Sequence, residues 1–441
     1  MNQEHVEMLN RMAAEAVREL DTIRHPSAKA KAKNLAKSLI GRGSANISDP
    51  VFWPAGLLLT GLMEAGHAGG SVPRLRNYYN SVENYLDGWL RQGAPVRNPD
   101  DALTGTVILE LYARTGNPAY KEAADKIAAY LKGCLRDENG SIIYGQQSGN
   151  SWIYADGTGM TAMFLARYAG ISDTRSQEDV KTAGNQQDKL PDSAPEAESK
   201  GESPEELQDD SPLRRYDPMA DARLQLLNFA RYGMDARSGL PYHAYDAEHG
   251  LKLGIIGWGR AVGWLLLGLS EYLICNPEDE ELADFARNIL TAVSDRVRPD
   301  GLLSWQLDCI EGPLDTSASG MIFYSMLRMN RALHVCPEQN EASGMDSSLP
   351  DTSLLDAAAS SPAKTRHACP EQSGVPRIDS SLLDAAAAAL YECVTEDGKV
   401  YWCSAECIDI ARYSQQYGHY SWGQGAVLAF LSLYEASREV S

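Results

Sequence analysis

The feature of this chain that most limits its fold is a regular alternation between two kinds of helical segment. Six segments are almost entirely apolar and rich in small residues, and they begin near Trp53, Asp100, Asp156, Trp258, Asp315 and Trp422. A helix that is apolar on all sides has to be buried on all sides. Glycine inside such a helix lowers its helix propensity, so we expect these glycines where two helices pack closely.

Six amphipathic segments separate the apolar ones, at residues 3–40, 74–91, 117–133, 216–232, 279–296 and 380–393. Their apolar residues recur at i, i+3 and i+4, so each helix buries a single stripe. We expect the first of them to break near Pro26. The alternation predicts an all-α fold, an (α/α)6 barrel of six inner and six outer helices. Strand signals are confined to short connections such as 141–145 and 399–403.

Two segments depart from this pattern, and we interpret both as insertions into one barrel domain that spans residues 1–441. Residues 172–212 contain 12 acidic and 4 basic residues and no aromatic one, which predicts a disordered acidic insertion. Residues 336–378 belong to an imperfect tandem duplication, in which CPEQ and DSSL each occur twice at an offset of 33. We expect the second copy to continue into the helix at 380–393 and the first to be a low-complexity loop.

Charge and composition exclude several classes of protein. The chain has 40 basic and 60 acidic residues, a formal net charge of −20, whereas a general nucleic-acid binder needs a basic surface. No stretch approaches the roughly 18 apolar residues of a membrane span, and Glu4 and Glu7 stand where a signal peptide would be apolar. We therefore expect a cytoplasmic protein. The eight cysteines lack metal-ligand spacing, so we predict no metal and no cofactor.

The N-termini of the inner helices of such a barrel meet at one rim, where unpaired N–H groups favour anions. The residues expected there are mostly acidic or aromatic: Phe52, Trp53, Asp100, Asp101, Tyr154, Asp156, Trp258, Arg260, Asp315, Tyr420 and Trp422. Aromatic rings stack on sugars and carboxylates act as acids and bases, which indicates a carbohydrate site. The competing interpretation is structural, because Asp is a common N-cap residue. The recurrence of these types at nearly every inner start favours a site.

One histidine stands apart from the others. His243 lies between two tyrosines just before the Trp258 segment. The histidines that we expect at the surface or in loops are His5, His25, His67, His249, His334 and His367. A sugar epimerase on the same barrel would use paired histidines, and only His243 and His419 are near inner helix starts.

Six motifs lie at or beside these helix starts: DDALTGTVILELYARTG (100–116), YADGTGMTAMFLARYA (154–169), YHAYD (242–246), WGRAVGW (258–264), DTSAS (315–319) and SWGQGA (421–426). In these motifs the chain resembles glycoside hydrolase families 88 and 105, the unsaturated glucuronyl and rhamnogalacturonyl hydrolases, and more closely the latter. The resemblance covers most of the chain outside the two insertions.

The resemblance implies an enzyme that releases a 4,5-unsaturated uronic acid from oligosaccharides made by polysaccharide lyases, of the pectin or rhamnogalacturonan type. It implies hydration of the C4=C5 vinyl ether rather than displacement at the anomeric carbon. Asp156 matches the residue that donates the proton, and Asp100 matches the second acidic position. Asp101 is an adjacent competitor for that second role. A carboxyl with this task must hold a proton near neutral pH.

The resemblance also implies a set of binding residues for a small acidic oligosaccharide. Arg260 matches an arginine that could pair bidentately with the uronate carboxylate. The other residues expected to bind substrate are His243, Trp258, Trp264, Met160, Trp53 and Trp422. No nucleic acid or membrane partner is expected, and the sequence does not indicate an oligomeric state.

Four positions differ from the residues common in the resembled family: Phe52, Ala55, Tyr144 and Tyr154. The first would often be Tyr, the second Asn, and the last Trp, while a histidine often lies near the third. These differences leave the linkage preference open. The alternatives are a non-catalytic oligosaccharide-binding protein, the epimerase, and an inverting glycosidase with two separated carboxylates.

Overall fold

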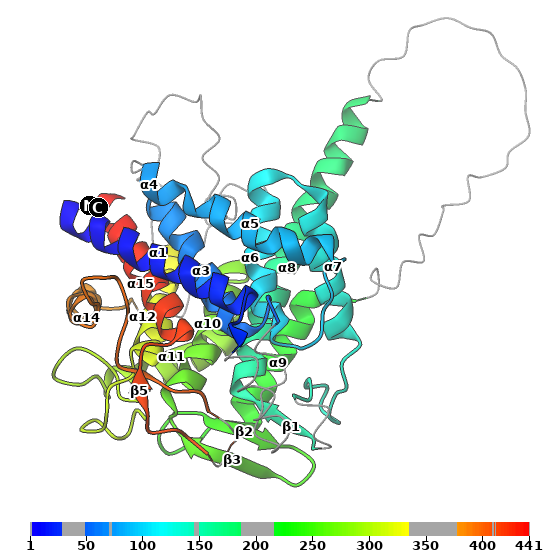
Figure 1. The fold of residues 1–441 in the computed structure, drawn as a ribbon. Coiled ribbons are helices and arrows are strands. Elements are labelled where there is room, and N and C mark those ends of the chain that lie inside the picture. The colour runs from blue at the N-terminus through cyan, green and yellow to red at the C-terminus, as the bar shows by residue number, and fades with distance from the viewer. Residues whose placement is uncertain are drawn as a thin grey trace, which may run out of the picture.

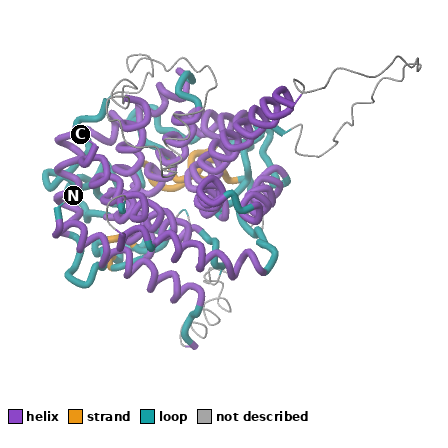
Figure 2. The backbone as a smooth tube through the Cα atoms, turned by 90° about the horizontal axis from the view of Figure 1, so that it is seen from above, coloured by secondary structure: helices purple, strands orange, loops and turns teal. Residues whose placement is uncertain are grey.

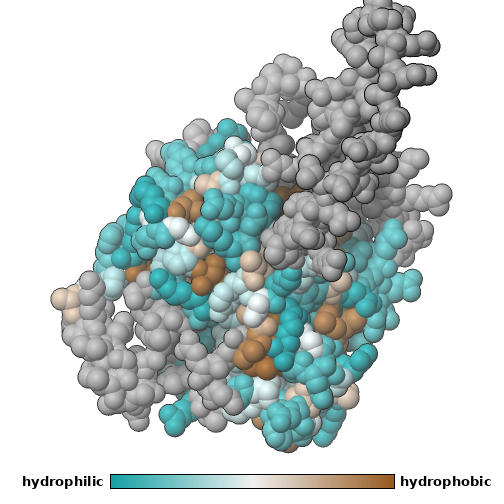
Figure 3. All heavy atoms as spheres, turned by 90° about the vertical axis from the view of Figure 1, so that its right-hand side faces the viewer, coloured by the Kyte–Doolittle hydropathy of each residue, from teal (hydrophilic) through white to brown (hydrophobic). Residues whose placement is uncertain are grey.

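The computed structural model describes residues 2–28, 49–69, 73–144, 150–186, 216–334, 377–407, 410 and 412–440. Within these residues helices make up most of the fold, and strands are few and short (Figures 1 and 2). No helix in the described ranges is long and apolar enough to cross a membrane. On the face drawn in Figure 3, hydrophobic residues form small separate groups among hydrophilic ones.

Six buried helices of the described chain form the inner ring: α3 (Trp53–Ala68), α6 (Asp101–Thr115), α8 (Ala155–Gln186), α10 (Gly259–Cys275), α12 (Thr316–His334) and α15 (Ser421–Val440). Each packs against the next, and α15 packs against α3, so the ring is closed. Every one of them begins within about one residue of the predicted start. The predicted (α/α)6 barrel is therefore confirmed.

The outer helices of the described residues are α1 (Gln3–Arg24), α5 (Tyr78–Arg91), α7 (Pro118–Lys132), α9 (Pro218–Tyr232), α11 (Glu280–Ser294) and α14 (Ser380–Glu392), with a short α4 (Pro73–Arg76) before α5. Five of them begin at an Asn or Asp whose side chain accepts a backbone N–H of the first turn: Asn2, Asn117, Asp217, Asp279 and Asp379. Helix α1 ends at Arg24, as expected from Pro26, and the rest of the predicted segment 3–40 lies largely outside the described residues.

Glycines in the inner helices allow the close packing that the sequence suggested. A Cβ atom on Gly61 of α3 would lie 2.6 Å from the carbonyl oxygen of Gly425 on α15. A Cβ atom on Gly159 of α8 would collide with the carbonyl oxygen of Trp264 on α10. Any larger residue at these positions would push the neighbouring helices apart.

The predicted strands were wrong in their location. The main sheet consists of β1 (Trp152–Tyr154), β2 (Tyr242–Asp246) and β3 (Leu251–Ile256), all antiparallel, and β4 (Cys403–Ser404) pairs with β5 (Tyr417–Gly418). The segments 141–145 and 399–403 contribute isolated bridges at Ile142 and Val400 and the first residue of β4. Strand β2 is buried almost throughout, so it lacks the alternating pattern by which a half-buried strand is recognised.

The two insertions are only partly described. Helix α8 continues to Gln186, so residues 172–186 are helical, unlike the predicted disorder, and 187–212 lies outside the described residues. Extending an existing helix is much easier than nucleating a new one. The predicted loop at 336–378 lies almost entirely outside the described residues, whereas the second copy continues into α14 as expected.

Buried charges connect the inner helices toward their C-terminal ends. Arg167 of α8 donates two hydrogen bonds to Glu271 of α10, at 2.8 and 2.7 Å, and Arg328 of α12 approaches the same carboxylate at 2.6 Å. His67 of α3 lies 2.6 Å from Glu110 of α6. Burial alone would lower the pKa of His67, but its glutamate partners raise it to about 10. His67 therefore lies in a helix with its side chain 22% exposed, and its ion pairs with Glu64 and Glu110 were not expected from the sequence.

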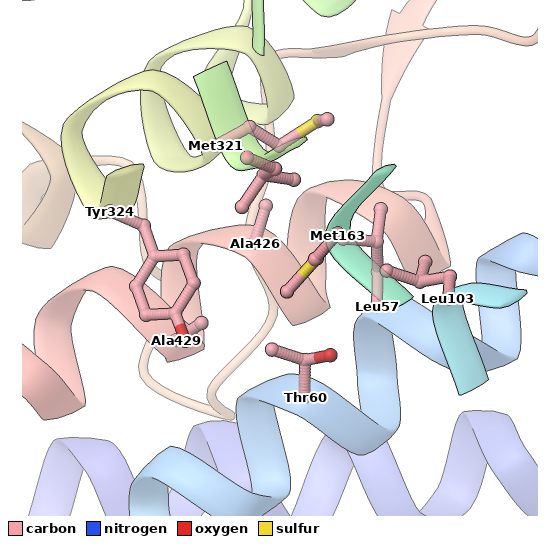
Figure 4. A pocket seen from close by; sticks show the side chains of 9 residues that line it. Leu57, Thr60, Leu103, Met163, Met321, Tyr324, Ala426 and Ala429 are labelled. Atoms are coloured by element: carbon pink, nitrogen blue, oxygen red, sulfur yellow. The ribbon is translucent and has the colours of Figure 1, made fainter. Parts of the chain in front are cut away.

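A small cavity lies at the centre of the barrel (Figure 4). Its lining comes from all six inner helices and is mainly apolar, apart from Thr60 and Tyr324. Its volume of about 10 Å³ is at the lower limit for a single water molecule. A sugar cannot enter it, so this cavity is not the carbohydrate site.

Candidate active site

Two carboxyl groups stand at the starts of neighbouring inner helices. Asp100 immediately precedes α6 and is 1% exposed, while Asp156 is the second residue of α8 and its side chain is 20% exposed. In each residue the Oδ1 atom is buried and has no hydrogen-bond partner within the described part of the chain. Asp100 makes no side-chain capping hydrogen bond to its own helix. The capping interpretation therefore does not account for it.

A tyrosine holds Asp100 in place. The Tyr144 hydroxyl donates a hydrogen bond of 2.6 Å to Asp100 Oδ2. Its ring packs over Gly157, where a Cβ atom would lie 2.5 Å from the ring, and against Tyr154 at 4.9 Å between ring centroids. The sequence marked Tyr144 only as a difference from the resembled family. In the sequence, the one hint is Gly157, directly after Asp156, because its missing side chain leaves room for the Tyr144 ring.

Burial changes the protonation of this carboxyl. It raises the pKa of Asp100 to about 8, and the charges of Asp101 and Asp156 act in the same direction, while the Tyr144 hydrogen bond opposes them. Asp100 is therefore mostly protonated at neutral pH. Its Oδ1, which has no hydrogen-bond partner among the described residues, is then the atom that can carry the proton.

Asp101 has a different role from Asp100. Its Oδ2 accepts the backbone N–H groups of Arg97 at 2.8 Å and Asn98 at 3.3 Å, so it closes the turn before α6. Burial raises the pKa of Asp101 to about 7, against these two hydrogen bonds. The structure thus favours Asp100, which Tyr144 links to the start of α8, as the second acid.

His243 lies on β2 and faces Asp156. Its Nε2 is 3.8 Å from Asp156 Oδ2, and its Nδ1 is 2.8 Å from the hydroxyl of Tyr413. Its ring contacts Trp258 at 4.4 Å and Tyr154 at 5.3 Å between centroids. The sequence identified His243 but missed Tyr413, because nothing in a loop sequence indicates which distant side chain it will reach.

Arg260 has partners other than the one expected. It is 2% exposed, and its Nη1 donates to the carbonyl and hydroxyl oxygens of Ser404 at 2.8 and 2.7 Å, while Nη2 donates to the Ala405 carbonyl at 2.9 Å. These bonds occupy the two Nη1 hydrogens and one Nη2 hydrogen, and they leave the Nε–H and the second Nη2–H side by side for a uronate carboxylate. Asp315, 3.9 Å away, accepts hydrogen bonds from Ser317 and Ser404, so here the structural interpretation holds.

The expected aromatic residues form two linked groups. Trp53 contacts Trp264 at 6.1 Å and Trp422 at 5.1 Å between ring centroids. The Arg260 guanidinium lies over the rings of both Trp258, at 4.7 Å, and Trp422, at 5.6 Å, and so connects this group to the His243 side. Trp53 and Trp422 are partly exposed and can meet a ligand.

Three of the expected binding residues are too buried to offer much surface. Trp258, Trp264 and Met160 are 3%, 2% and 1% exposed. Of these, Trp264 packs edge-on against the partly exposed Trp53. Met160 packs in the main core, one helical turn after Asp156.

Two groups of side chains in the described ranges have the geometry to hold a metal ion: Glu15, Glu19 and His419, and Asp246, Glu248 and His249. His419 Nε2 lies 2.7 Å from Glu19 Oε1 and 3.4 Å from Glu15 Oε1, and these glutamates raise the pKa of His419 against the effect of burial. We interpret this first group as an ion pair. His419 is thus directed at α1, which gives no support to an epimerase that pairs it with His243.

The sequence model of glycosyl hydrolase family 88 matches residues 10–198 and 210–340. The chain belongs to this family. It is a glycoside hydrolase, and the resemblance seen in its motifs is confirmed.

Individual relatives agree with this assignment. The unsaturated rhamnogalacturonyl hydrolase YesR of Bacillus subtilis is 22% identical over 284 residues, which cover 62% of this chain and 70% of that protein. A possible member of glycoside hydrolase family 105 from Klebsiella pneumoniae has a similar structure, with a TM-score of 0.67, 14% identity, and coverage of 99% of this chain and 94% of that one.

Another solved structure is the unsaturated glucuronyl hydrolase of Bacillus sp. GL1, responsible for the degradation of glycosaminoglycan. It has a TM-score of 0.53 and 15% identity, and the match covers 87% of this chain and 86% of that one. At these identities the structural likeness establishes the shared (α/α)6 barrel and no finer property.

Proposed function

We propose that this protein releases a 4,5-unsaturated uronic acid from lyase-generated oligosaccharides of the pectin or rhamnogalacturonan type by hydrating the C4=C5 bond. One observation carries the proposal. Asp100 and Asp156 stand at the starts of neighbouring inner helices, and burial raises the pKa of Asp100 to about 8, so this carboxyl holds its proton at neutral pH beside the more exposed Asp156. The similarity to a rhamnogalacturonyl hydrolase supports this class of substrate.

Asp156 is the group that transfers the proton, because its side chain is 20% exposed while Asp100 is 1% exposed. It donates a proton to C4, and positive charge develops at C5 and the ring oxygen. Water then adds at C5 and returns a proton to the Asp156 carboxylate. The hemiketal at C5 opens to a ketone, and the hemiacetal formed at C1 releases the remaining saccharide. No bond to the protein is formed.

The surrounding residues prepare this step. Asp100, held by Tyr144, keeps negative charge low beside Asp156 and can share its proton. His243 faces the Asp156 carboxylate, and the partly exposed Trp53 and Trp422 offer faces for sugar stacking. Arg260 holds the Ser404–Ala405 backbone beside the rings of Trp258 and Trp422, and its Nε–H and second Nη2–H can pair with the uronate carboxylate.

Substitution of the proton donor tests the proposal. The protein should remove the ultraviolet absorbance of an unsaturated rhamnogalacturonan disaccharide, and Asp156→Asn should lower the rate by about 100-fold or more. Asp284→Asn, on the exposed side of α11, is the matched control and should keep full activity. Full activity in Asp156→Asn would refute the assignment of the donor. No loss of absorbance with any unsaturated uronyl disaccharide would refute the proposed function.

A further inference from the structure

A tyrosine from the C-terminal part of the chain completes the surroundings of His243. Tyr413 lies in the connection between β4 and β5, 170 residues away from His243 in the sequence. Its hydroxyl is 2.8 Å from His243 Nδ1 and accepts the backbone N–H of Ile255 at 3.3 Å. Its ring also contacts those of Trp258 and Trp305, at 5.6 and 6.0 Å between centroids.

The β2–β3 hairpin is shaped to admit this hydroxyl. Gly254 has a φ of +81°, and a Cβ atom there would lie 2.6 Å from the Tyr413 hydroxyl oxygen and 2.7 Å from His243 Cβ. The strand register is also irregular between Tyr242 and Ala244, which flank His243. A glycine is thus required where the two side chains and the hairpin backbone meet.

The hydrogen bonds around Tyr413 determine where the imidazole proton resides. A phenol has one proton to donate, and one lone pair of Tyr413 is occupied by the Ile255 N–H. Burial raises the pKa of Tyr413, so the hydroxyl keeps its proton and needs an acceptor. Nδ1 of His243 is the acceptor that the described residues offer. A nitrogen that accepts this bond carries no proton, which leaves the proton of the neutral ring on Nε2.

We propose that Tyr413 is a positioning residue that fixes His243 in the Nε2-protonated tautomer, with this N–H directed at Asp156. The inference rests on the proposed function only for its catalytic consequence. The N–H stabilises Asp156 after it has given its proton to C4. The opposite tautomer would present a lone pair to the carboxylate at 3.8 Å and repel the negative charge that forms there.

The tautomer can be measured without any substrate. Nitrogen-15 NMR of histidine-labelled protein distinguishes Nε2–H from Nδ1–H, and the His243 signal is identified by its absence in His243→Gln. We expect Nε2–H in the wild-type protein and a mixture of tautomers in Tyr413→Phe. Wild-type His243 in the Nδ1–H form would overturn the assignment. The neighbouring Tyr242→Phe is the control and should leave the spectrum of His243 unchanged.

Kinetics then test the consequence. Tyr413→Phe should lower kcat by about 10- to 100-fold with little change in KM, and Tyr242→Phe should leave both unchanged. The titratable groups that face the imidazole are Asp156, Tyr154 and Tyr413.

Two outcomes separate the proposals from each other. Gly254→Ala should reproduce both the kcat loss and the tautomer mixture, because its methyl group meets the Tyr413 hydroxyl and His243 Cβ and separates the two side chains. An unchanged kcat in Tyr413→Phe, in a protein that hydrolyses the substrate, would refute the positioning role. A wild-type protein without activity would refute the proposed function, and the NMR spectrum would still decide the tautomer.

Discussion

Replacing Asp100 by asparagine should stabilise the fold while it removes activity. The pKa of this carboxyl rises from 3.8 to about 8 through burial, which means that the folded protein binds its proton more tightly than the unfolded chain does. Stability is therefore lost as pH rises from the unfolded pKa to the folded one. Asparagine cannot titrate, keeps the shape, and can still accept the hydrogen bond from Tyr144.

The size of the effect follows from the shift. One pKa unit corresponds to about 1.4 kcal/mol, so keeping Asp100 protonated at about pH 7 costs on the order of 4 kcal/mol relative to pH 4. The free energy of unfolding of Asp100→Asn should exceed that of the wild type, and this difference should grow by about 2–3 kcal/mol between about pH 5.5 and pH 7.5. Because this is a difference between two proteins, the other titrating groups of the barrel largely cancel.

Denaturant unfolding at the two pH values measures this directly. The comparison includes the wild type, Asp100→Asn and the exposed control Asp284→Asn. The difference in unfolding free energy between the control and the wild type should not grow with pH. The same Asp100→Asn protein should lose at least about 100-fold in hydrolysis rate. If Asp100→Asn exceeded the wild type in unfolding free energy by the same amount at both pH values, the raised pKa of Asp100 would be refuted. The argument that this carboxyl keeps a proton at neutral pH would fall with it.

Three further predictions concern other parts of the barrel. Tyr144→Phe removes a hydrogen bond that lowers the pKa of Asp100, so the basic limb of the pH profile of kcat/KM should move to higher pH. An unshifted limb would contradict this. Gly159→Ala should lower the free energy of unfolding by about 2 kcal/mol or more, because its methyl group meets the Trp264 carbonyl, and an unchanged melting temperature would argue against that packing. His67→Gln removes the nearest cation of Glu110 and leaves Glu110 and Glu64 with the more distant Arg167 and Arg328, at 3.5 and 3.9 Å, so it should cost about 3 kcal/mol in denaturant unfolding.

The barrel and its rim could be predicted because periodicity alone separates inner from outer helices. Once the inner helices are recognised, their starts share one rim by construction. That places Asp100 and Asp156 on the same rim without any knowledge of side-chain contacts, whereas His243 reaches them from β2, before α10. Caps such as Asp279 and Asp379 are equally local signals, since each binds the first turn of its own helix.

The missed features depend on contacts between distant segments. Strand β2 is buried almost throughout, so it shows no alternation in sequence. Tyr413 reaches His243 across 170 residues, along a connection whose path only the folded chain determines. The contacts of Arg260 with the Ser404 and Ala405 carbonyls are likewise not visible in the sequence, because they join residues about 144 positions apart. The ion pairs of His67 likewise join helices that are remote in sequence.

The central claim is that the C4=C5 bond, rather than the anomeric carbon, is attacked. Its most direct test follows the ultraviolet absorbance of an unsaturated rhamnogalacturonan disaccharide and the release of the saturated sugar in the same quenched samples. Hydration predicts that the absorbance falls before or together with the appearance of the saturated sugar, and that Asp156→Asn abolishes both. Release of the saturated sugar ahead of the fall in absorbance would mean that the glycosidic bond breaks first, and would contradict the hydration mechanism.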